Sequence, residues 1–158
     1  MQEYEMRRKD RAISEEEAVD LLNRAEYGVL ATAGADGAPY TVPLSYVFME
    51  GKVYFHCARN GRKIDNLKAE SRVSFVVVGD TEVVYDGGFG TYYKSAQLNG
   101  RARLVEEPEE WQASLRALAQ KYLPAHLDKV DAYIKRYDKQ TLVYAVEGGI
   151  TGKARKKV

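Results

Sequence analysis

Cysteine is nearly absent from this sequence, which contains only Cys57, so no disulfide can form within one chain. We expect a reducing, cytoplasmic location, because proteins of oxidising compartments commonly carry paired cysteines. Long apolar runs are also absent, since none reaches the roughly 20 residues that span a bilayer. The N-terminus lacks the apolar core of a signal peptide. We therefore expect no association with a membrane.

A strong excess of one charge is absent as well. The chain carries 24 Lys and Arg against 23 Asp and Glu, a net charge of +1, and its isoelectric point is near 7.8. A dedicated nucleic-acid binder would be expected to have an isoelectric point above about 9. The basic clusters at 7–11 and 153–157 lie near the ends of the sequence, where solvated charge is usual. No nucleic-acid partner is therefore expected.

Several motifs of catalysis and nucleotide binding are missing or incomplete. His56 and Cys57 are adjacent and His126 is remote, so the ligand spacing of a metal site is lacking. The segment 147–154 resembles a nucleotide-binding loop but lacks its first glycine and its final Ser or Thr. The glycine-rich segment 87–90 precedes a predicted strand, unlike a dinucleotide fingerprint. We therefore expect no metal site, no Walker loop and no Rossmann domain.

What the sequence does contain is a series of short β patterns separated by turns. Short turns and helices only at the periphery favour a barrel over a layered α/β fold. We predict a mainly β (α+β) fold, an antiparallel barrel of six strands that closes on itself, in one domain over residues 1–158. Its core covers about 6–150, followed by a basic tail at 151–158. The predicted strands are 27–33, 39–49, 53–57, 72–78, 91–106 and 141–146, and the predicted helices include 14–25, 111–122 and 127–137.

Three local features add detail to the β prediction. Pro43 lacks an N–H group, so its strand must lie at a sheet edge or carry a bulge. The apolar run 72–78 predicts a strand that is buried on both faces, followed by a glycine-rich connection over 79–90. Gly100, inside the long strand, predicts a bulge or a bend.

The most informative stretch is 56–67, which reads as a strand running into a helix with a cationic first turn. The free N–H groups of a helix start carry partial positive charge, so Arg59, Arg62 and Lys63 destabilise it unless an anion compensates. Two of the other predicted helices begin instead with acidic residues. Backbone N–H groups, a guanidinium and an ammonium together can bind a phosphate. The alternative interpretation is a solvated basic face.

Several segments, in their order along the chain, are similar to one family. Strands 40–48 and 53–57, followed by the helix start Gly61-Arg62-Lys63, resemble the FMN-binding split barrel of the pyridoxamine 5′-phosphate oxidase-like superfamily. Within it, the sequence resembles the 5-nitroimidazole-resistance (Nim-type) branch. The resemblance covers about residues 6–150. The segments that carry the Nim-type likeness are 6–10, 42–46 and 56–67.

The resemblance implies a homodimer with two FMN sites, each built between the subunits. Arg62 and Lys63 would hold the FMN phosphate, as the charge argument also indicates. The strand at 42–45 would line the isoalloxazine, residues 56–58 would continue the floor of the site, and the strand at 92–97 would come from around the dimer interface. The implied cofactor-binding residues are Val42, Pro43, Leu44, Ser45, His56, Cys57, Ala58, Arg62, Lys63, Ser95 and Gln97.

The resemblance also implies a function. His56 matches a histidine near the flavin that is linked to reductive nitroimidazole chemistry, so it is the implied catalytic residue, and a purely structural histidine is the alternative. We predict an FMN-dependent oxidoreductase that reduces a small organic acceptor such as a nitroimidazole. A non-catalytic flavin-binding or storage protein is one alternative. Pyridoxamine phosphate oxidation is a minor one, because the C-terminal Trp and Arg that clasp that substrate have no strong equivalent here.

Overall fold

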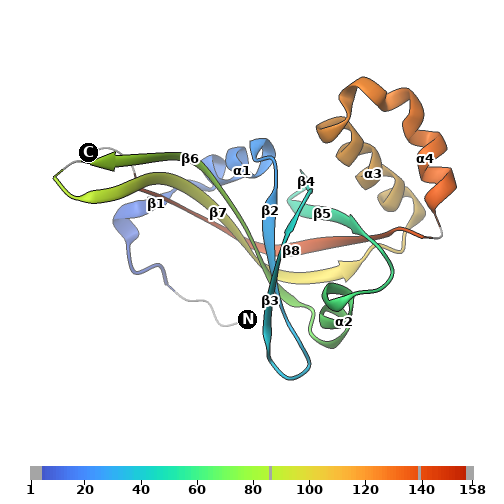
Figure 1. Cartoon of the computed structure of the whole chain (residues 1–158), viewed down its shortest axis with the longest axis horizontal. Coiled ribbons are helices and arrows are strands. Elements are labelled where there is room, and N and C mark those ends of the chain that lie inside the picture. Colours follow the sequence, from blue (N-terminus) through green and yellow to red (C-terminus); the bar gives the residue numbers. More distant parts are fainter. Residues whose placement is uncertain (1–4, 86, 139, 156–158) are drawn as a thin grey trace.

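The computed structural model describes residues 5–85, 87–138 and 140–155, which form an eight-stranded antiparallel sheet with helices around it (Figure 1). The strands are β1 (Ala12–Ile13), β2 (Gly28–Ala33), β3 (Pro39–Leu44), β4 (Val47–Met49), β5 (Lys52–Cys57), β6 (Arg72–Tyr85), β7 (Phe89–Leu104) and β8 (Leu142–Arg155). Their order in the sheet is β3-β2-β6-β7-β8-β5-β4, and β1 pairs with the far end of β8. The predicted basic tail therefore begins inside a strand.

The number of strands differs from the predicted six for local reasons. The predicted strand 39–49 is divided into β3 and β4 by a bend at Ser45 and Tyr46, and β1 is too short to show an alternating pattern. Among the described residues β3 and β4, at the two ends of the sheet, do not pair with each other. The mainly β, α+β fold with antiparallel strands and peripheral helices is confirmed. The prediction of six strands in a closed barrel is wrong, because the sheet has eight strands and stays open.

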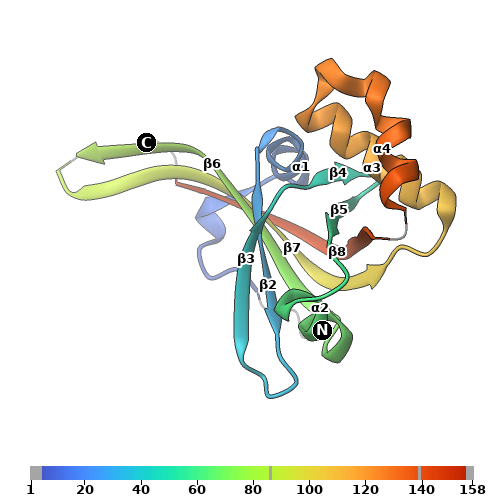
Figure 2. The same cartoon turned by 45° about the vertical axis from the view of Figure 1, so that its right-hand side comes forward.

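β6 and β7 form a long hairpin where the sequence predicted a glycine-rich connection over 79–90. β6 runs to Tyr85 and β7 begins at Phe89, so the two strands project beyond the rest of the sheet (Figure 2). The register shifts just beyond Gly79. A Cβ atom on Gly79 would lie 2.8 Å from Leu21 Cδ1. The glycine therefore marks a close contact with a helix and does not end the strand.

Gly100 and Pro43 test two more predictions. The register between β6 and β7 runs through Gly100 without a shift, so of the two predicted alternatives, a bulge or a bend, the bulge is wrong. A Cβ atom on Gly100 would lie 1.8 Å from the carbonyl oxygen of Glu147, so glycine permits the close approach of β8. Pro43 lies in the edge strand β3, whose register with β2 is continuous. The edge-strand alternative is confirmed, and the strand needs no bulge.

The helices lie around the sheet, and in the described part of the chain none is long and apolar enough to cross a membrane. The helices predicted at 14–25 and 111–122 are confirmed. The one predicted at 127–137 begins as a 3-10 turn that is kinked at His126 and then continues as an α-helix. The elements are α1 (Glu15–Arg24), α2 (Arg62–Ala69), α3 (Pro108–Tyr122), α4 (Val130–Tyr137), and the 3-10 turns η1 (Lys9–Arg11) and η2 (Pro124–Lys129).

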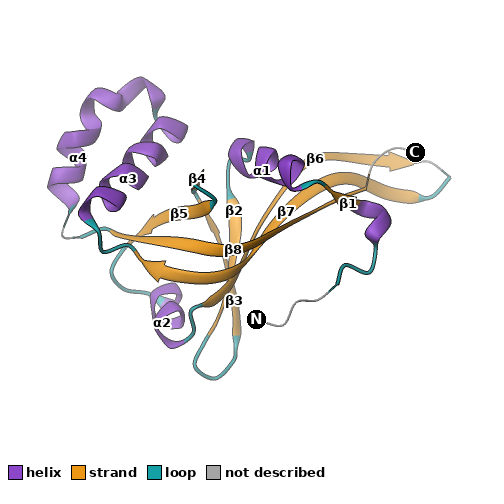
Figure 3. Ribbon diagram, turned by 180° about the vertical axis from the view of Figure 1, so that it is seen from behind, coloured by secondary structure: helices purple, strands orange, loops and turns teal. Residues whose placement is uncertain are grey.

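The two faces of the sheet carry separate apolar cores. On the inner face, α1 buries Leu21 and Leu22 against strand residues such as Phe75. On the outer face, α3 and α4 cover only the end of the sheet at β5 and β8, where they bury Tyr54 and Val143 (Figure 3). Successive strand residues point to opposite faces, so each strand contributes alternately to the two sides.

The central strand β6 is buried on one face only. Val73, Phe75 and Val77 are buried in the inner core, whereas Val78 is 56% exposed. The prediction that 72–78 is buried on both faces is therefore wrong for the single chain. The apolar run carries β-branched residues on its outer side as well, which the inner core does not explain.

The rest of the outer face is a broad surface to which five strands contribute. Its side chains are all partly or fully exposed. Three of the predicted site residues, Pro43, Ser95 and Gln97, lie in it. Strand register places Pro43, Val29, Val76, Gln97 and Thr151 in one row of this face and Val78, Ser95 and Lys153 in a neighbouring row.

Candidate functional site

The start of α2 lies after the short loop that follows β5, where Ala58 is exposed. Gly61 is the N-cap and has a φ of 119°, which favours glycine. It offers no side chain to cap the helix, and Arg62 and Lys63 are the first two helical residues. Asp65 is the acid of the first turn. The predicted helix with a cationic start is confirmed.

Polar and apolar contacts fix α2 beside β2 and β3 (Figures 1 and 2). The buried Asn66 side chain donates a hydrogen bond from Nδ2 to Thr32 Oγ1 at 2.9 Å, and Thr32 Oγ1 donates to the Tyr40 carbonyl oxygen at 3.4 Å. Ile64 and Leu67 are buried in the inner core. These contacts hold the first turn of α2 in a fixed position against the sheet.

The side chains of Arg62 and Lys63 lie over aromatic rings. Arg62 Cζ is 4.8 Å from the centre of the Tyr40 ring, and Lys63 Nζ is 5.3 Å from that of Phe55. Within the described residues neither cation forms an ion pair, whereas Arg24 of α1 contacts two carboxylates. A cation–π contact at an exposed site contributes only about 0.5–1 kcal/mol, less than the about 1.5–3 kcal/mol of a hydrogen bond to a charged group. Both cations can therefore accept a stronger, anionic partner.

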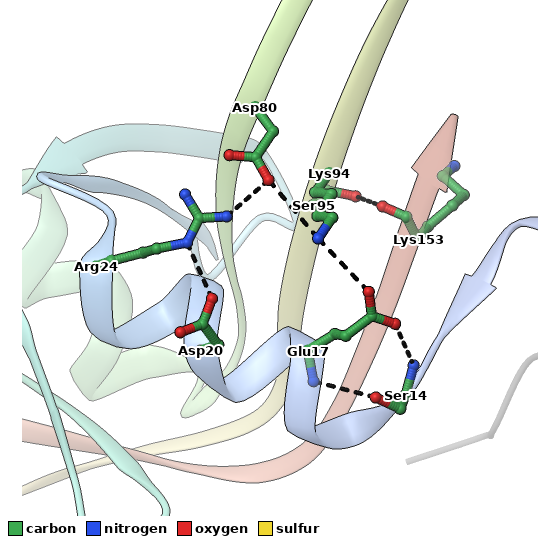
Figure 4. Close-up of polar contacts among 8 residues, drawn as sticks. All are labelled: Ser14, Glu17, Asp20, Arg24, Asp80, Lys94, Ser95 and Lys153. Atoms are coloured by element: carbon green, nitrogen blue, oxygen red, sulfur yellow. Dashed lines mark hydrogen bonds and ion pairs between the residues drawn. The ribbon is translucent and has the colours of Figure 1, made fainter. Parts of the chain in front are cut away.

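The start of α1 shows the opposite arrangement, in which the charges are matched inside the chain (Figure 4). Ser14 Oγ accepts a hydrogen bond from the Glu17 N–H at 3.1 Å, and the Glu17 carboxylate accepts one from the Ser14 N–H at 3.3 Å. Lys94 Nζ lies 3.5 Å from Glu17 and 3.8 Å from Asp80, which also contacts Arg24 at 2.7 Å. This helix start needs no external ion.

An apolar wall lies beside the two cations of α2 on the inner side of β5 and β3. The Phe55 ring stacks on Tyr144, with centres 5.8 Å apart and planes at 10°. Val42, Leu44 and Cys57 pack against the same core. Burial raises the pKa of the Cys57 thiol, and the nearby Lys63 offsets this only in part. Cys57 is therefore a neutral thiol at pH 7, and it acts as part of the wall.

His56 lies on the other side of β5 from Phe55 and Cys57, because strand residues alternate. It pairs in register with Val143, which belongs to the core beneath α3 and α4. The ring stays accessible to solvent, yet partial burial lowers its pKa, and the ammonium of Lys63 lowers it further. At neutral pH the imidazole is uncharged, with one ring nitrogen as donor and the other as acceptor.

Besides His56, three of the predicted site residues lie on the outer face and not beside the rings under Arg62 and Lys63. Ser95 Oγ donates to the Lys153 carbonyl oxygen at 3.3 Å, and Gln97 Nε2 donates to Ser74 Oγ at 2.7 Å. Pro43 lies in the same row as Gln97, but β2 and β6 separate their strands, a distance of about 14 Å at ordinary strand spacing. One chain therefore does not assemble all the predicted residues around one point.

Sequence reasoning missed a network behind the bend between β3 and β4, where Ser45 is exposed. The fully buried Tyr46 donates its hydroxyl to the Leu22 carbonyl oxygen at 2.5 Å, and its N–H donates to the Tyr122 hydroxyl at 3.0 Å. Lys121 Nζ lies 3.8 Å from the centre of the Tyr46 ring and has no hydrogen-bond partner in the described residues, and burial lowers its pKa. The one signal in the sequence was the position of Tyr122 on the apolar stripe of α3.

The comparison with known families covers most of the chain. Residues 14–149 match the profile of the family described as pyridoxamine 5′-phosphate oxidase. The chain belongs to this family. The resemblance to this superfamily, predicted from strands 40–48 and 53–57 and the helix start at 61–63, is thereby confirmed. No curated protein matches the sequence of this family member.

Solved structures with the same fold are similar over nearly the whole length of this family member. A candidate 5-nitroimidazole antibiotic resistance protein from Bacteroides thetaiotaomicron matches with a TM-score of 0.75 and 20% identity, over 90% of this chain and 86% of that one. A conserved hypothetical protein from Mycobacterium tuberculosis matches with a TM-score of 0.80 and 22% identity, over 98% of this chain and 97% of that one. The FAD and heme binding protein from Mycobacterium smegmatis matches with a TM-score of 0.79 and 20% identity, over 91% of this chain and 72% of that one. At these identities the likeness shows a shared fold.

Proposed function

We propose that this member of the pyridoxamine 5′-phosphate oxidase family is a flavoprotein that binds FMN. The start of α2 carries the proposal, because Arg62 and Lys63 have no carboxylate partner in the described residues and Gly61 supplies no side-chain cap. A phosphate monoester would match both cations and the N–H groups of the first turn. The Mycobacterium smegmatis neighbour binds FAD and heme, so flavin binding occurs on this fold.

The residues around α2 fit a ligand that joins a phosphate to a planar ring system. A Cβ atom placed on Gly61 would meet nothing within 4 Å, so the space beside the first turn is open. The cations would gain a phosphate without breaking an ion pair to any of the described residues. Farther along β3 from Tyr40, which lies under Arg62, Pro43 and Ser45 are exposed, and Val42 and Leu44 are partly buried. This end of β3 would line the isoalloxazine.

A bound flavin would supply the redox chemistry, taking up and releasing electrons. The residues of the chain would bind and orient it, with Arg62 and Lys63 at the phosphate. His56, uncharged at neutral pH, would hold a proton at one ring nitrogen and offer the other as an acceptor. As the acceptor of electrons we propose a small organic molecule such as a nitroimidazole, the compound class named for the Bacteroides thetaiotaomicron neighbour.

We also propose that the protein is a homodimer with two flavin sites between the subunits. The outer face supports this, because Val78 is 56% exposed, and near the tip of the β6–β7 hairpin Val83 and Tyr85 are 87% and 76% exposed. Large apolar side chains that are this exposed are available for contact with a second copy. A second copy packed on this face would bring its Ser95 and Gln97 toward the flavin site that starts at α2 of the first copy.

The visible absorption spectrum of the purified protein, followed by FMN titration, tests the first step. A flavin spectrum with one FMN per chain is the expected result, and a protein that neither contains nor binds FMN would refute the proposal. Anaerobic mixing of the reduced holoprotein with a 5-nitroimidazole tests the second step. Rapid re-oxidation is expected. Bound FMN without re-oxidation would indicate flavin storage, and oxidation of pyridoxamine 5′-phosphate would indicate the activity for which the family is named.

A further inference from the structure

A cavity of about 480 Å³ lies between α3, η2 and α4, away from α2 and β3. Figure 3 shows these helices as a separate hairpin at one end of the sheet. The volume is within the range of about 300–1,000 Å³ that is usual for small-molecule sites. Its floor includes Leu115 and Leu118, which are 7% and 5% exposed. The proposed flavin site makes no use of this cavity.

The lining of the cavity combines apolar side chains with two basic ones. His126, at the kink in η2, and Lys129, at its end, both line it. Within the described residues Lys129 forms no ion pair, whereas Arg116 on the neighbouring α3 contacts Asp131 at 2.7 Å. A cation without a carboxylate beside an apolar floor is complementary to an anion that carries an apolar tail.

The mouth of the cavity is also apolar. Leu123 and Tyr133 line it and are 57% and 50% exposed. Burying such side chains against a hydrocarbon chain is favourable by about 25 cal/mol per Å² of apolar surface removed from water. A ligand whose tail extends from the floor to the mouth would cover both of them.

We propose that this cavity binds a medium-chain fatty carboxylate. The tail packs among Leu115, Leu118 and Ala119, and the carboxylate accepts hydrogen bonds from Lys129 and His126. The proposal is independent of the flavin, because none of these residues belongs to α2, β3 or β5. A second copy of the chain is the competing occupant, and the experiment separates the two.

Titration calorimetry of the full chain with decanoate, and with decanol as the uncharged analogue, tests the proposal. We expect saturable binding of one decanoate per chain and a dissociation constant about tenfold higher for decanol, because the charge-assisted hydrogen bonds are lost. Lys129→Gln should weaken decanoate binding about tenfold and leave decanol binding unchanged. Since Lys129 is exposed, this variant is expected to fold normally.

Filling the cavity provides a second, independent test. Ala119→Phe places a ring in the cavity and should weaken the binding of both ligands about tenfold or more, whereas Ala113→Phe, at an exposed position of the same helix, should change neither. Three results would overturn the proposal: no saturable decanoate binding, equal binding of decanoate and decanol, or unchanged binding by Ala119→Phe. A wild-type dimer that Ala119→Phe converts to monomer would also overturn it, because a second copy would then occupy the cavity.

Discussion

α1 and α2 begin with opposite electrostatic arrangements, although both pack against the inner core. At α1, Ser14 and Glu17 satisfy the free N–H groups and Lys94 balances the carboxylate. At α2, Arg62 and Lys63 add positive charge to an uncapped turn. The charges at the start of α1 are thus matched within the chain, whereas Arg62 and Lys63 of α2 have no carboxylate partner in the described residues. We infer that substitutions at α1 change stability, whereas substitutions at α2 change ligand binding.

Reversing one charge at α2 provides the largest expected effect. Lys63→Glu should raise the dissociation constant for FMN at least about thirtyfold, or about 2 kcal/mol, because a charge-assisted contact becomes a repulsion. Fluorescence titration with FMN measures it. The matched control is Lys68→Glu in the last turn of the same helix, which should leave the affinity unchanged. Equal affinities for Lys63→Glu and wild type would contradict the assignment of the phosphate site.

Removing the imidazole beside this helix start should affect turnover and leave binding intact. His56→Ala should retain FMN, because Arg62 and Lys63 are unchanged, and should lose at least about tenfold in turnover with nitroaromatic acceptors. Steady-state kinetics under anaerobic conditions, with FMN content measured in parallel, test this. Loss of FMN from the variant would mean that His56 is structural. Full activity between about pH 5 and 8 would mean that it has no part in the reaction.

A charge on the outer face should separate the subunits without touching either helix start. Val78→Asp should raise the dissociation constant of the dimer about tenfold, because the carboxylate would be buried in an apolar interface. Sedimentation equilibrium measures the change. Leu127→Asp, at an exposed apolar position on η2, is the control and should leave the dimer intact. A wild-type monomer with stoichiometric FMN would refute the dimer itself.

At α1 the expected effect is confined to stability. Ser14→Ala removes the N-cap hydrogen bond and should lower the free energy of unfolding by about 1 kcal/mol, measured by urea denaturation. FMN affinity should stay at the wild-type value. If Ser14→Ala weakened FMN binding as much as Lys63→Glu, the two helix starts would not differ in role.

The smallest expected effect is on the titration of His56. Lys63→Glu should raise the pKa of His56, because the ammonium that lowers it is replaced by a carboxylate, and NMR titration of the imidazole measures this. In the wild type the lowered pKa means that the folded state binds fewer protons, so the free energy of unfolding should fall as the pH drops below about 6.5. Lys63→Glu should reduce this dependence, and Lys68→Glu should leave it unchanged.

The features that the sequence predicted correctly were those that depend on residues close together in the chain. The capping box at Ser14 and the cations Arg62 and Lys63 lie within a few residues of the helix starts that they mark, and both helices were predicted. Gly79 and Gly100 were misread because their function depends on Leu21 and Glu147, which lie far away in the sequence.

The face on which a strand side chain lies can be predicted from the sequence, but the register between distant strands cannot. Alternation along β5 already implied that His56 and Cys57 face opposite sides, so that division could have been predicted. The row that joins Pro43 to Gln97 depends on the order of the strands, which only the sheet reveals.

The position of β8 has a consequence for how the chain is made. β8 follows every other element in the sequence, yet it lies between β7 and β5 and also pairs with β1. Until residues 142–155 have been synthesised, the edges of β5 and β7 that β8 will pair with have no partner from this chain. Unpaired strand edges promote aggregation during folding. The edges of β5 and β7 would therefore favour aggregation of a growing chain until β8 joins the sheet.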